Sequence, residues 1–316
     1  MLILAQTDPV DTLKSDTDTT LALLRARAAL GDDVRLYTAL DLSWADGDLY
    51  ARARPMPGRD REPEAEPVRV RDAAMVMIRD DPPFDLRRQT AAHLHARLPA
   101  FEAGGPLMVN HPHALMTLSS KLATLGLGEA APESLVTADA EAAAAFAKHR
   151  RGVVVKPLYG YGGAGVTVLD ADANVIDAIA QFQAEGEPDD YREFFIVQER
   201  LAAADQGDKR ILLADGEPIA AVLRVPAEAG GLGNLSAGGK AVRTDITGRE
   251  RDIVDALKPT LSKAGAFLTG LDFIGERLTE VNTVSPGGLV DALQVSNEPV
   301  IERFWNAVDR RLSERQ

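Results

Sequence analysis

Residues 153–170 read VVVKPLYGYGGAGVTVLD, and residues 160–165 within them match the dinucleotide-binding pattern G-x-G-x-x-G. That pattern binds a dinucleotide only where a strand precedes the glycines and a helix follows them. Here β-branched valines precede the glycines, and the β-branched run Val166-Thr167-Val168 follows them. The segment therefore predicts two strands joined by a glycine-rich loop, as in a hairpin, and argues against a nicotinamide or flavin site.

A glycine-rich hairpin can still bind phosphate, because its loop exposes a row of backbone N–H groups to phosphate oxygens. Lys156 adds a positive charge on the preceding strand. No Gly-Lys-Ser or Gly-Lys-Thr follows the glycines, which excludes a P-loop. The alternative is a surface hairpin in which the glycines serve only the turn.

The composition indicates a globular protein and narrows its partners. The chain has 316 residues, 45% of them hydrophobic and 26% charged, which is enough for two or three packed subdomains. Its net charge of −13 argues against binding to nucleic acid or to an anionic membrane surface. The absence of cysteine excludes disulfides, thiolate metal sites and a cysteine nucleophile. Because we find neither a signal-peptide pattern nor a stretch that approaches a membrane span, we expect a cytoplasmic protein. The negative net charge still permits a small anionic substrate, if basic groups gather in one cleft.

The order of predicted elements indicates an α/β fold in three parts. Residues 1–118 alternate strands and helices, which is typical of a parallel α/β domain. Within them, residues 55–67 are rich in Pro, Arg and Glu and are expected to form a solvated loop. Residues 119–198 contain the hairpin and are predicted to form a small α+β lid. Residues 199–316 are predicted to be β-rich, with a closing helix over residues 301–312.

Three hard oxygen donors are expected to converge in the last part of the chain. Glu280 and Asn282 are two apart on one predicted strand, so their side chains point to the same face. Asp272 lies on the preceding strand of a hairpin predicted to turn at Gly275. Oxygen ligands of this kind suit Mg²⁺ beside phosphates. The alternative is a solvent-facing strand of polar residues.

Two arginines in the same part could bind an anion. Arg210 leads into one predicted strand and Arg224 ends a later one. Guanidinium groups bind a carboxylate or a transferring phosphoryl group through paired hydrogen bonds. The glycine-rich segment 229–240 is long enough to be a mobile cover for such a site. For the arginines alone, the alternative is ordinary surface charge.

Taken in order along the chain, these motifs resemble those of the bacterial glutathione synthetases, which have the ATP-grasp fold. The resemblance covers nearly the whole chain. It rests on Arg79-x-Asp-Pro-Pro-Phe-Asp85, Lys156-Pro…Gly160-x-Gly162-Gly163, Gln198-Glu-Arg-Leu201, Gly207-Asp208-Lys209-Arg210, Gly233-Asn234-Leu-Ser-Ala-Gly-Gly239, Gly270-Leu-Asp272-Phe-Ile-Gly275 and Thr279-Glu280-Val-Asn282-x-x-Ser285-Pro286.

The resemblance implies a nucleotide site between the lid and the last part of the chain. The residues it assigns to ATP are Lys121 and Lys156 at the phosphates, Gly160, Tyr161, Gly162 and Gly163 in the covering loop, Gln198, Glu199, Arg200 and Leu201 at the adenine, and Asp208 nearby. The residues it assigns to Mg²⁺, or to Mn²⁺ in its place, are Asp272, Glu280 and Asn282.

The resemblance also implies residues for the chemical step and for the other substrates. Arg210 and Arg224 would be catalytic, neutralising the substrate carboxylate and the γ-phosphoryl group. The residues it assigns to the other substrates are Arg79, Asn234, Ser285, Pro286, Gly287 and Gly288.

The reaction that the resemblance implies joins γ-glutamylcysteine to glycine through an acyl phosphate, and the family suggests a homo-oligomer. Leu232 and the pair Gly287-Gly288 depart from the usual family pattern, so we expect an altered substrate pocket. Two alternatives stay open: an ATP-grasp ligase with another acid or amine, and a non-catalytic nucleotide-binding module. The Glu280/Asn282 pair and the two arginines argue against the second.

Overall fold

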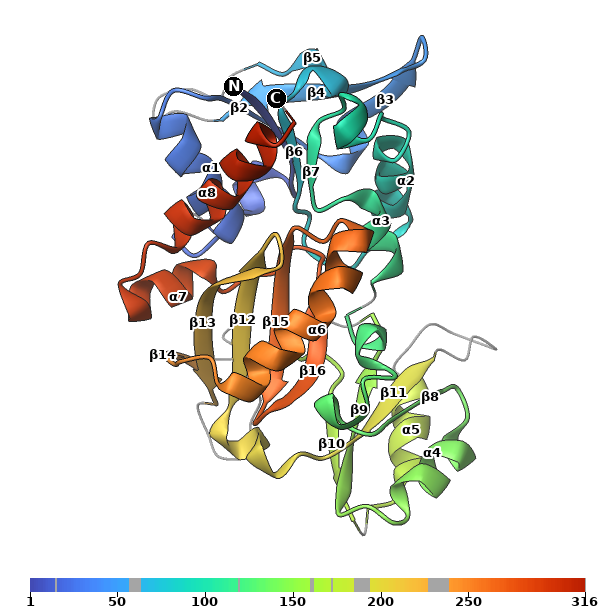
Figure 1. Ribbon diagram of the computed structural model, residues 1–316. Helices are drawn as coiled ribbons and strands as arrows, with labels where there is room; N and C mark the ends of the chain where they lie inside the picture. The colour runs from blue at the N-terminus through green and yellow to red at the C-terminus, as the bar shows by residue number, and fades with distance from the viewer. Residues whose placement is uncertain are drawn as a thin grey trace.

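The computed structural model contains three β-sheets, each partly covered by helices (Figure 1). It describes residues 1–14, 16–56, 64–118, 120–159, 162–171, 173–184, 194–226 and 239–315. No helix within these ranges is long and apolar enough to span a membrane.

The first sheet has seven strands in the order β3-β4-β2-β1-β6-β7, with β5 paired to β4. Its strands are β1 (Leu2–Gln6), β2 (Asp33–Tyr37), β3 (Leu42–Ala45), β4 (Asp48–Pro55), β5 (Glu66–Arg69), β6 (Met75–Ile78) and β7 (Leu107–Val109). The helices connected with it are α1 (Thr19–Ala29), α2 (Leu86–His95) and α3 (Pro112–Thr117). Strand β1 pairs in parallel with β2 and β6, and β6 with β7, so the predicted parallel α/β arrangement is confirmed.

Strands β3, β4 and β5 form an antiparallel extension of this sheet that we did not predict. The bounds predicted for the loop over residues 55–67 were too wide at both ends, because β4 extends to Pro55 and β5 begins at Glu66. Asp46 and Gly47, at the β3–β4 turn, both have positive φ angles, 53° and 78°. The Asp-Gly pair is a hairpin signal that the sequence does contain.

The second sheet is antiparallel, in the order β10-β9-β11-β8. Its elements are β8 (Ser134–Thr137), β9 (Gly152–Pro157), β10 (Thr167–Asp170), β11 (Phe195–Glu199), α4 (Ala140–Ala147) and α5 (Val175–Ala184). Strands β9 and β10 flank the glycines, so the predicted strand–loop–strand arrangement is confirmed. The apolar sides of both helices pack on one face of the sheet around Phe195 and Ile179, which leaves the face carrying Lys156 free for the site.

The third sheet is antiparallel, in the order β14-β13-β12-β15-β16. Its elements are β12 (Asp208–Ala214), β13 (Glu217–Val225), β14 (Lys240–Arg243), β15 (Leu268–Ile274), β16 (Arg277–Asn282), α6 (Gly248–Ala264) and α7 (Leu289–Ser296). Helix α6 begins with a capping box between Thr247 and Glu250 and ends at Gly265, whose φ of 75° is left-handed. Its buried side covers one face of the sheet around Phe273.

The last helix, α8 (Val300–Ser313), returns to the first sheet, and Figure 1 shows it beside α1. Phe304 and Trp305 are buried with Leu23 of α1, and the Trp305 Nε1–H donates to the carbonyl oxygen of Leu23 at 3.0 Å. The same cluster contains side chains of β1, β12 and β13. The first and third sheets therefore share one hydrophobic core.

We expect acid to weaken the first sheet's core through His95. The buried His95 ring donates from Nδ1 to the Ala91 carbonyl oxygen at 2.7 Å, so its Nε2 accepts the Tyr37 hydroxyl at 2.8 Å. Burial lowers the pKa of His95 to about 4, although the hydrogen bond to Ala91 opposes this shift. Protonation removes the acceptor for Tyr37 and places a charge in an apolar site.

Because the folded pKa of His95 lies below its unfolded value, its neutral form supports stability near pH 7, and this support decreases as the pH falls from about 6.5 to 4. Up to about 3 kcal/mol of unfolding free energy is involved. Urea unfolding of the wild type and of His95→Gln across this range measures it. An equal pH dependence in the two proteins would contradict the prediction.

Candidate active site

A cavity of about 1030 Å³ lies between the three sheets. The first part of the chain contributes Asp81, Pro82 and Phe84 from the loop after β6. The part of the chain that forms the second sheet contributes Lys156 and the hairpin residues Gly162 and Gly163, and Arg200 follows its last strand. The third sheet contributes Asp208, Arg210, Asp272, Glu280 and Asn282. Residues far apart in the sequence thus line one chamber, and most of those predicted for ATP and metal are among them.

The three predicted metal ligands converge through the register of β15 and β16. Asp272 is paired with Glu280, and Gly270 with Asn282, in the predicted hairpin. The Asn282 Nδ2 donates to Asp272 Oδ2 at 3.2 Å. The solvent-facing alternative is wrong, because Asp272 is buried and all three side chains line the cavity.

Asp272 is the centre of an ionic network with both predicted catalytic arginines. Arg210 binds it in bidentate fashion, with Nε–Oδ1 at 2.7 Å and Nη2–Oδ2 at 2.6 Å. Arg224 Nη2 lies 3.0 Å from Asp272 Oδ2 and also donates to Asp208 Oδ2, while Arg224 Nε donates to Asp208 Oδ1 at 3.0 Å. Burial disfavours ionisation of Asp272, but the charges and hydrogen bonds of Arg210 and Arg224 outweigh it and hold the Asp272 pKa well below its usual range. The arginines are fixed in place, as a preorganised anion-binding site requires.

Two lysines face this centre from the lid side. Lys121 is buried, and its Nζ lies 3.8 Å from Glu280 Oε1. It directly precedes the single turn of 3-10 helix at Leu122–Thr124. Burial lowers the pKa of Lys156; the Glu280 carboxylate opposes this shift and the Lys121 charge adds to it. Two cations held this close together favour binding of an anion between them.

The donor set fits a hard divalent cation. Two carboxylates and one amide supply oxygen atoms within one chamber, as Mg²⁺ prefers. The described residues contain no group of three or more His, Cys, Asp or Glu side chains that could hold a metal by themselves. A metal here would take its remaining ligands from phosphate and water, and Asn282 would have to turn its amide oxygen toward it.

The segment predicted for adenine is anchored by its side chains. Gln198 is buried and its Nε2 donates to Ser134 Oγ at 3.0 Å, and Glu199 Oε1 accepts from Arg277 at 3.1 Å. Arg200 lines the cavity, whereas the side chains of Gln198, Glu199 and Leu201 do not. The contact of these three residues with the adenine therefore stays a prediction.

The residues predicted for the other substrates fall into two sets. Ser285, Pro286 and Gly287 line the cavity, and Gly288, with a φ of 99°, leads into α7 behind them. Arg79 is buried outside the cavity lining, where it donates from Nη2 to the Pro286 carbonyl oxygen at 3.1 Å. In this structure Arg79 supports the substrate wall instead of forming it.

The predicted site residues Gly160, Tyr161 and Asn234, and the departure at Leu232, lie outside the described residues. The cavity wall made by Asp81, Pro82 and Phe84 was not predicted from the sequence. The Arg79–Asp85 motif contained the signal, but only Arg79 was taken from it.

The fold and the site define an ATP-grasp enzyme. The model of the prokaryotic glutathione synthetase ATP-grasp domain matches residues 120–297, and that of the prokaryotic glutathione synthetase N-terminal domain matches residues 1–116. The chain belongs to the prokaryotic glutathione synthetase family, and the resemblance noted in the sequence is confirmed.

Curated relatives cover nearly the whole chain. The glutathione synthetase of Mesorhizobium japonicum is 36% identical over 314 residues, covering 97% of each chain. That of Brucella melitensis is 34% identical over 316 residues, covering 98% of each chain. Among solved structures, the D-cycloserine synthetase DcsG aligns with a TM-score of 0.65 at 17% identity, covering 98% of this chain and 99% of that one. The ATP-grasp ligase PsnB in complex with Mg and ADP aligns with a TM-score of 0.63 at 19% identity, covering 98% of each. These two structures support the fold.

Proposed function

We propose that this protein is a glutathione synthetase that joins γ-glutamylcysteine to glycine with ATP, releasing ADP and phosphate. The observation that carries the proposal is the single cavity in which two lysines face an arginine–carboxylate centre. The near-full-length similarity to glutathione synthetases supports the choice of substrates.

The first step makes the acid substrate reactive. A carboxylate oxygen of γ-glutamylcysteine attacks the γ-phosphorus of ATP, the bond to the β–γ bridging oxygen breaks, and ADP leaves. Lys121 and Lys156 hold the phosphates, while Arg210 and Arg224 offset the negative charge that gathers around the transferred group. In the second step the glycine nitrogen attacks the acyl carbon, phosphate leaves, and the nitrogen loses a proton.

The protein contributes mainly position and charge to both steps. No nucleophilic side chain is required, which agrees with the absence of cysteine. Asp272, Glu280 and Asn282 would hold Mg²⁺, or Mn²⁺ in its place. The metal would supply charge neutralisation between the phosphates. The covering glycine loop would keep water from the acyl phosphate.

The assignment is tested by ADP release from the purified protein. We expect turnover with γ-glutamylcysteine and glycine to exceed that with a panel of other acids and amines, by a smaller margin than is usual for the family, because Leu232 and Gly287-Gly288 depart from its pattern. Robust turnover with another pair would favour a different ATP-grasp ligase, and nucleotide binding without turnover would favour a non-catalytic module. A cytoplasmic location and a homo-oligomeric assembly, both implied by the family, form part of this proposal.

Lys156→Ala is expected to weaken ATP binding at least about tenfold while the fold stays intact. Lys156 lines the cavity from β9, and a charged hydrogen bond to phosphate contributes about 1.5–3 kcal/mol. Nucleotide titration measures the effect, and thermal unfolding checks the fold. Lys148→Ala, at the far end of α4 and absent from the cavity lining, is the control. Unchanged ATP affinity in Lys156→Ala would reject the lid assignment.

A further inference from the structure

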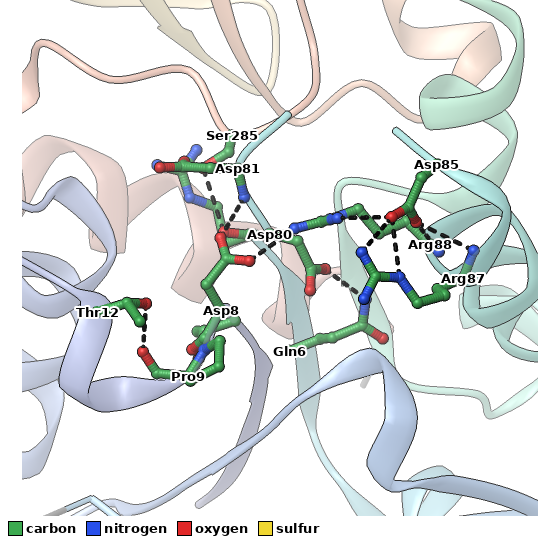
Figure 2. A network of polar contacts seen from close by, with 12 residues as sticks. Gln6, Asp8, Pro9, Thr12, Asp80, Asp81, Asp85, Arg87, Arg88 and Ser285 are labelled. Atoms are coloured by element: carbon green, nitrogen blue, oxygen red, sulfur yellow. Dashed lines mark hydrogen bonds and ion pairs between the residues drawn. The ribbon is translucent and has the colours of Figure 1, made fainter. Parts of the chain in front are cut away.

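One wall of the catalytic cavity is the loop between β6 and α2. It contributes Asp81, Pro82 and Phe84 to the cavity lining. Figure 2 shows that polar contacts from separate parts of the chain fix this loop. The reaction described above leaves the function of this wall open.

An ionic relay holds the main chain of Asp81 in place. Asp8 Oδ2 accepts the Asp81 backbone N–H at 2.7 Å, and Asp8 Oδ1 accepts from Arg88 Nη2 at 2.7 Å (Figure 2). Arg88 Nη1 also lies 3.3 Å from Asp85 Oδ2, at the start of α2. The loop is thereby attached to the segment after β1 and to the next helix, so the main chain of Asp81 is held in place before a ligand binds.

The same loop is attached to the substrate wall of the third sheet. Ser285 Oγ donates to the Arg79 carbonyl oxygen at 3.2 Å, and Arg79 Nη2 donates to the Pro286 carbonyl oxygen at 3.1 Å. Ser285 and Pro286 line the cavity together with Asp81. The position of Asp81 is therefore fixed relative to the end of the cavity where the acid and amine substrates bind in the proposed function.

The Asp81 carboxylate itself is unengaged. Asp81 is exposed, and its side chain forms no hydrogen bond or ion pair within the described part of the chain. Burial lowers the pKa of Arg79 to about 10, and the negative charge of Asp81 opposes this shift. The hydrogen bonds of Arg79, however, go to Thr20 and Pro286. The neighbouring arginines are also used, since Arg88 binds Asp8 and Asp85.

Charge is distributed unevenly along the cavity. Lys121, Lys156 and Arg210 lie around the place where phosphate and the reacting carboxylate meet in the proposed function. The carboxylates beside them are already paired, Glu280 with Lys121 and Asp272 with Arg210. Asp81 offers the complementary charge on another wall. In γ-glutamylcysteine, the α-ammonium group of the glutamyl unit lies at the end of the molecule remote from the reacting cysteinyl carboxylate.

We propose that Asp81 binds the α-ammonium group of the acid substrate and so selects acids that carry a primary amine at the end remote from the reacting carboxylate. The inference rests on the proposed function. Because the relay through Asp8 and Arg88 fixes the loop in advance, little ordering has to be done on binding.

A cycle of one mutation and one substrate change tests the proposal. KM and kcat are measured for wild type and Asp81→Asn with γ-glutamylcysteine and with glutarylcysteine, which lacks only the amino group. In wild type, we expect removal of the amino group to raise KM roughly tenfold to hundredfold, because the substrate then loses one charged hydrogen bond to the protein. In Asp81→Asn, KM for γ-glutamylcysteine should rise similarly, and the two substrates should become nearly equivalent.

Two further measurements make the test specific. The KM for ATP and the thermal unfolding midpoint should not change in Asp81→Asn. Asp252→Asn is the matched control, because Asp252 is exposed on α6, away from the cavity, and has no partner among the described residues. It should keep the full preference for the amino group.

The outcomes separate the two hypotheses. If wild type makes glutathione but Asp81→Asn loses the same factor with both acids, or loses nothing, the role of Asp81 is rejected and the proposed function stands. If wild type does not join γ-glutamylcysteine to glycine at all, the proposed function fails and this inference fails with it.

Discussion

Replacing Glu280 by glutamine is expected to lower kcat at least roughly a hundredfold, because a metal that bridges transferring phosphates contributes several kcal/mol to the transition state. Glu280 stands opposite Asp272 across the β15–β16 hairpin and 3.8 Å from Lys121. Glutamine keeps the size of the side chain and removes only its charge. Initial rates over a range of Mg²⁺ concentrations measure the effect, and a shift of the metal dependence to higher concentration is expected.

Glu302→Gln on the exposed side of α8 is the control and should have the wild-type rate. Glu280→Gln should also bind ATP less well in alkaline solution. The Glu280 charge opposes the lowering of the Lys156 pKa that burial causes, so without it Lys156 loses its proton at a lower pH. A near-normal rate at ordinary Mg²⁺ concentration would show that the metal site is misplaced.

Arg210→Met is expected to reduce both activity and stability. The bidentate contact with Asp272 is buried, and breaking such a pair by removing one partner costs about 3–5 kcal/mol. The transferred phosphoryl group loses a positive charge at the same time, so kcat should fall at least roughly a hundredfold. Chemical unfolding and single-turnover rates measure the two effects separately.

The double variant Arg210→Met/Asp272→Asn separates structure from chemistry. Neutralising Asp272 should restore part of the stability, because the buried charge that Arg210 balanced together with Arg224 is gone, whereas activity should stay low. Because the pKa of Asp272 is lower in the folded than in the unfolded protein, the network stabilises the fold at pH values above the usual pKa of an aspartate. This stabilisation is lost as the pH falls from that value toward the lower pKa of the folded protein. Single Arg210→Met should show less of this acid sensitivity. Normal turnover in either variant would contradict a catalytic role for Arg210.

The local pattern of residue types was sufficient to predict those parts of the fold that depend on residues close together in the sequence. The strands around the glycine loop follow from β-branched residues, and the convergence of Glu280 and Asn282 follows from the two-residue period of a strand. Helix α7 was missed, because the Gly287-Gly288 pair before it gives no N-cap signal and no side chain caps it.

The ionic network could not be predicted, because it depends on the register between strands. Arg210 pairs with Asp272 only because β12 and β15 align at that residue, and Asp208 pairs with Arg224 across β12 and β13. A bulge beside Asp272 shifts the hairpin by one residue, and no periodicity in the sequence shows it. The burial of Arg79 is similarly non-local, since its partners are Thr20 and Pro286.

The return of helix α8 to the first sheet has a consequence for how the chain matures on the ribosome. Phe304 and Trp305 complete the apolar core around Leu23. Strand β1 is synthesised first but lacks this cover until nearly three hundred further residues have been translated. A nascent chain interrupted before α8 would therefore present an open apolar surface for chaperones and proteases. The core of the first sheet is thus completed only after α8 has been synthesised.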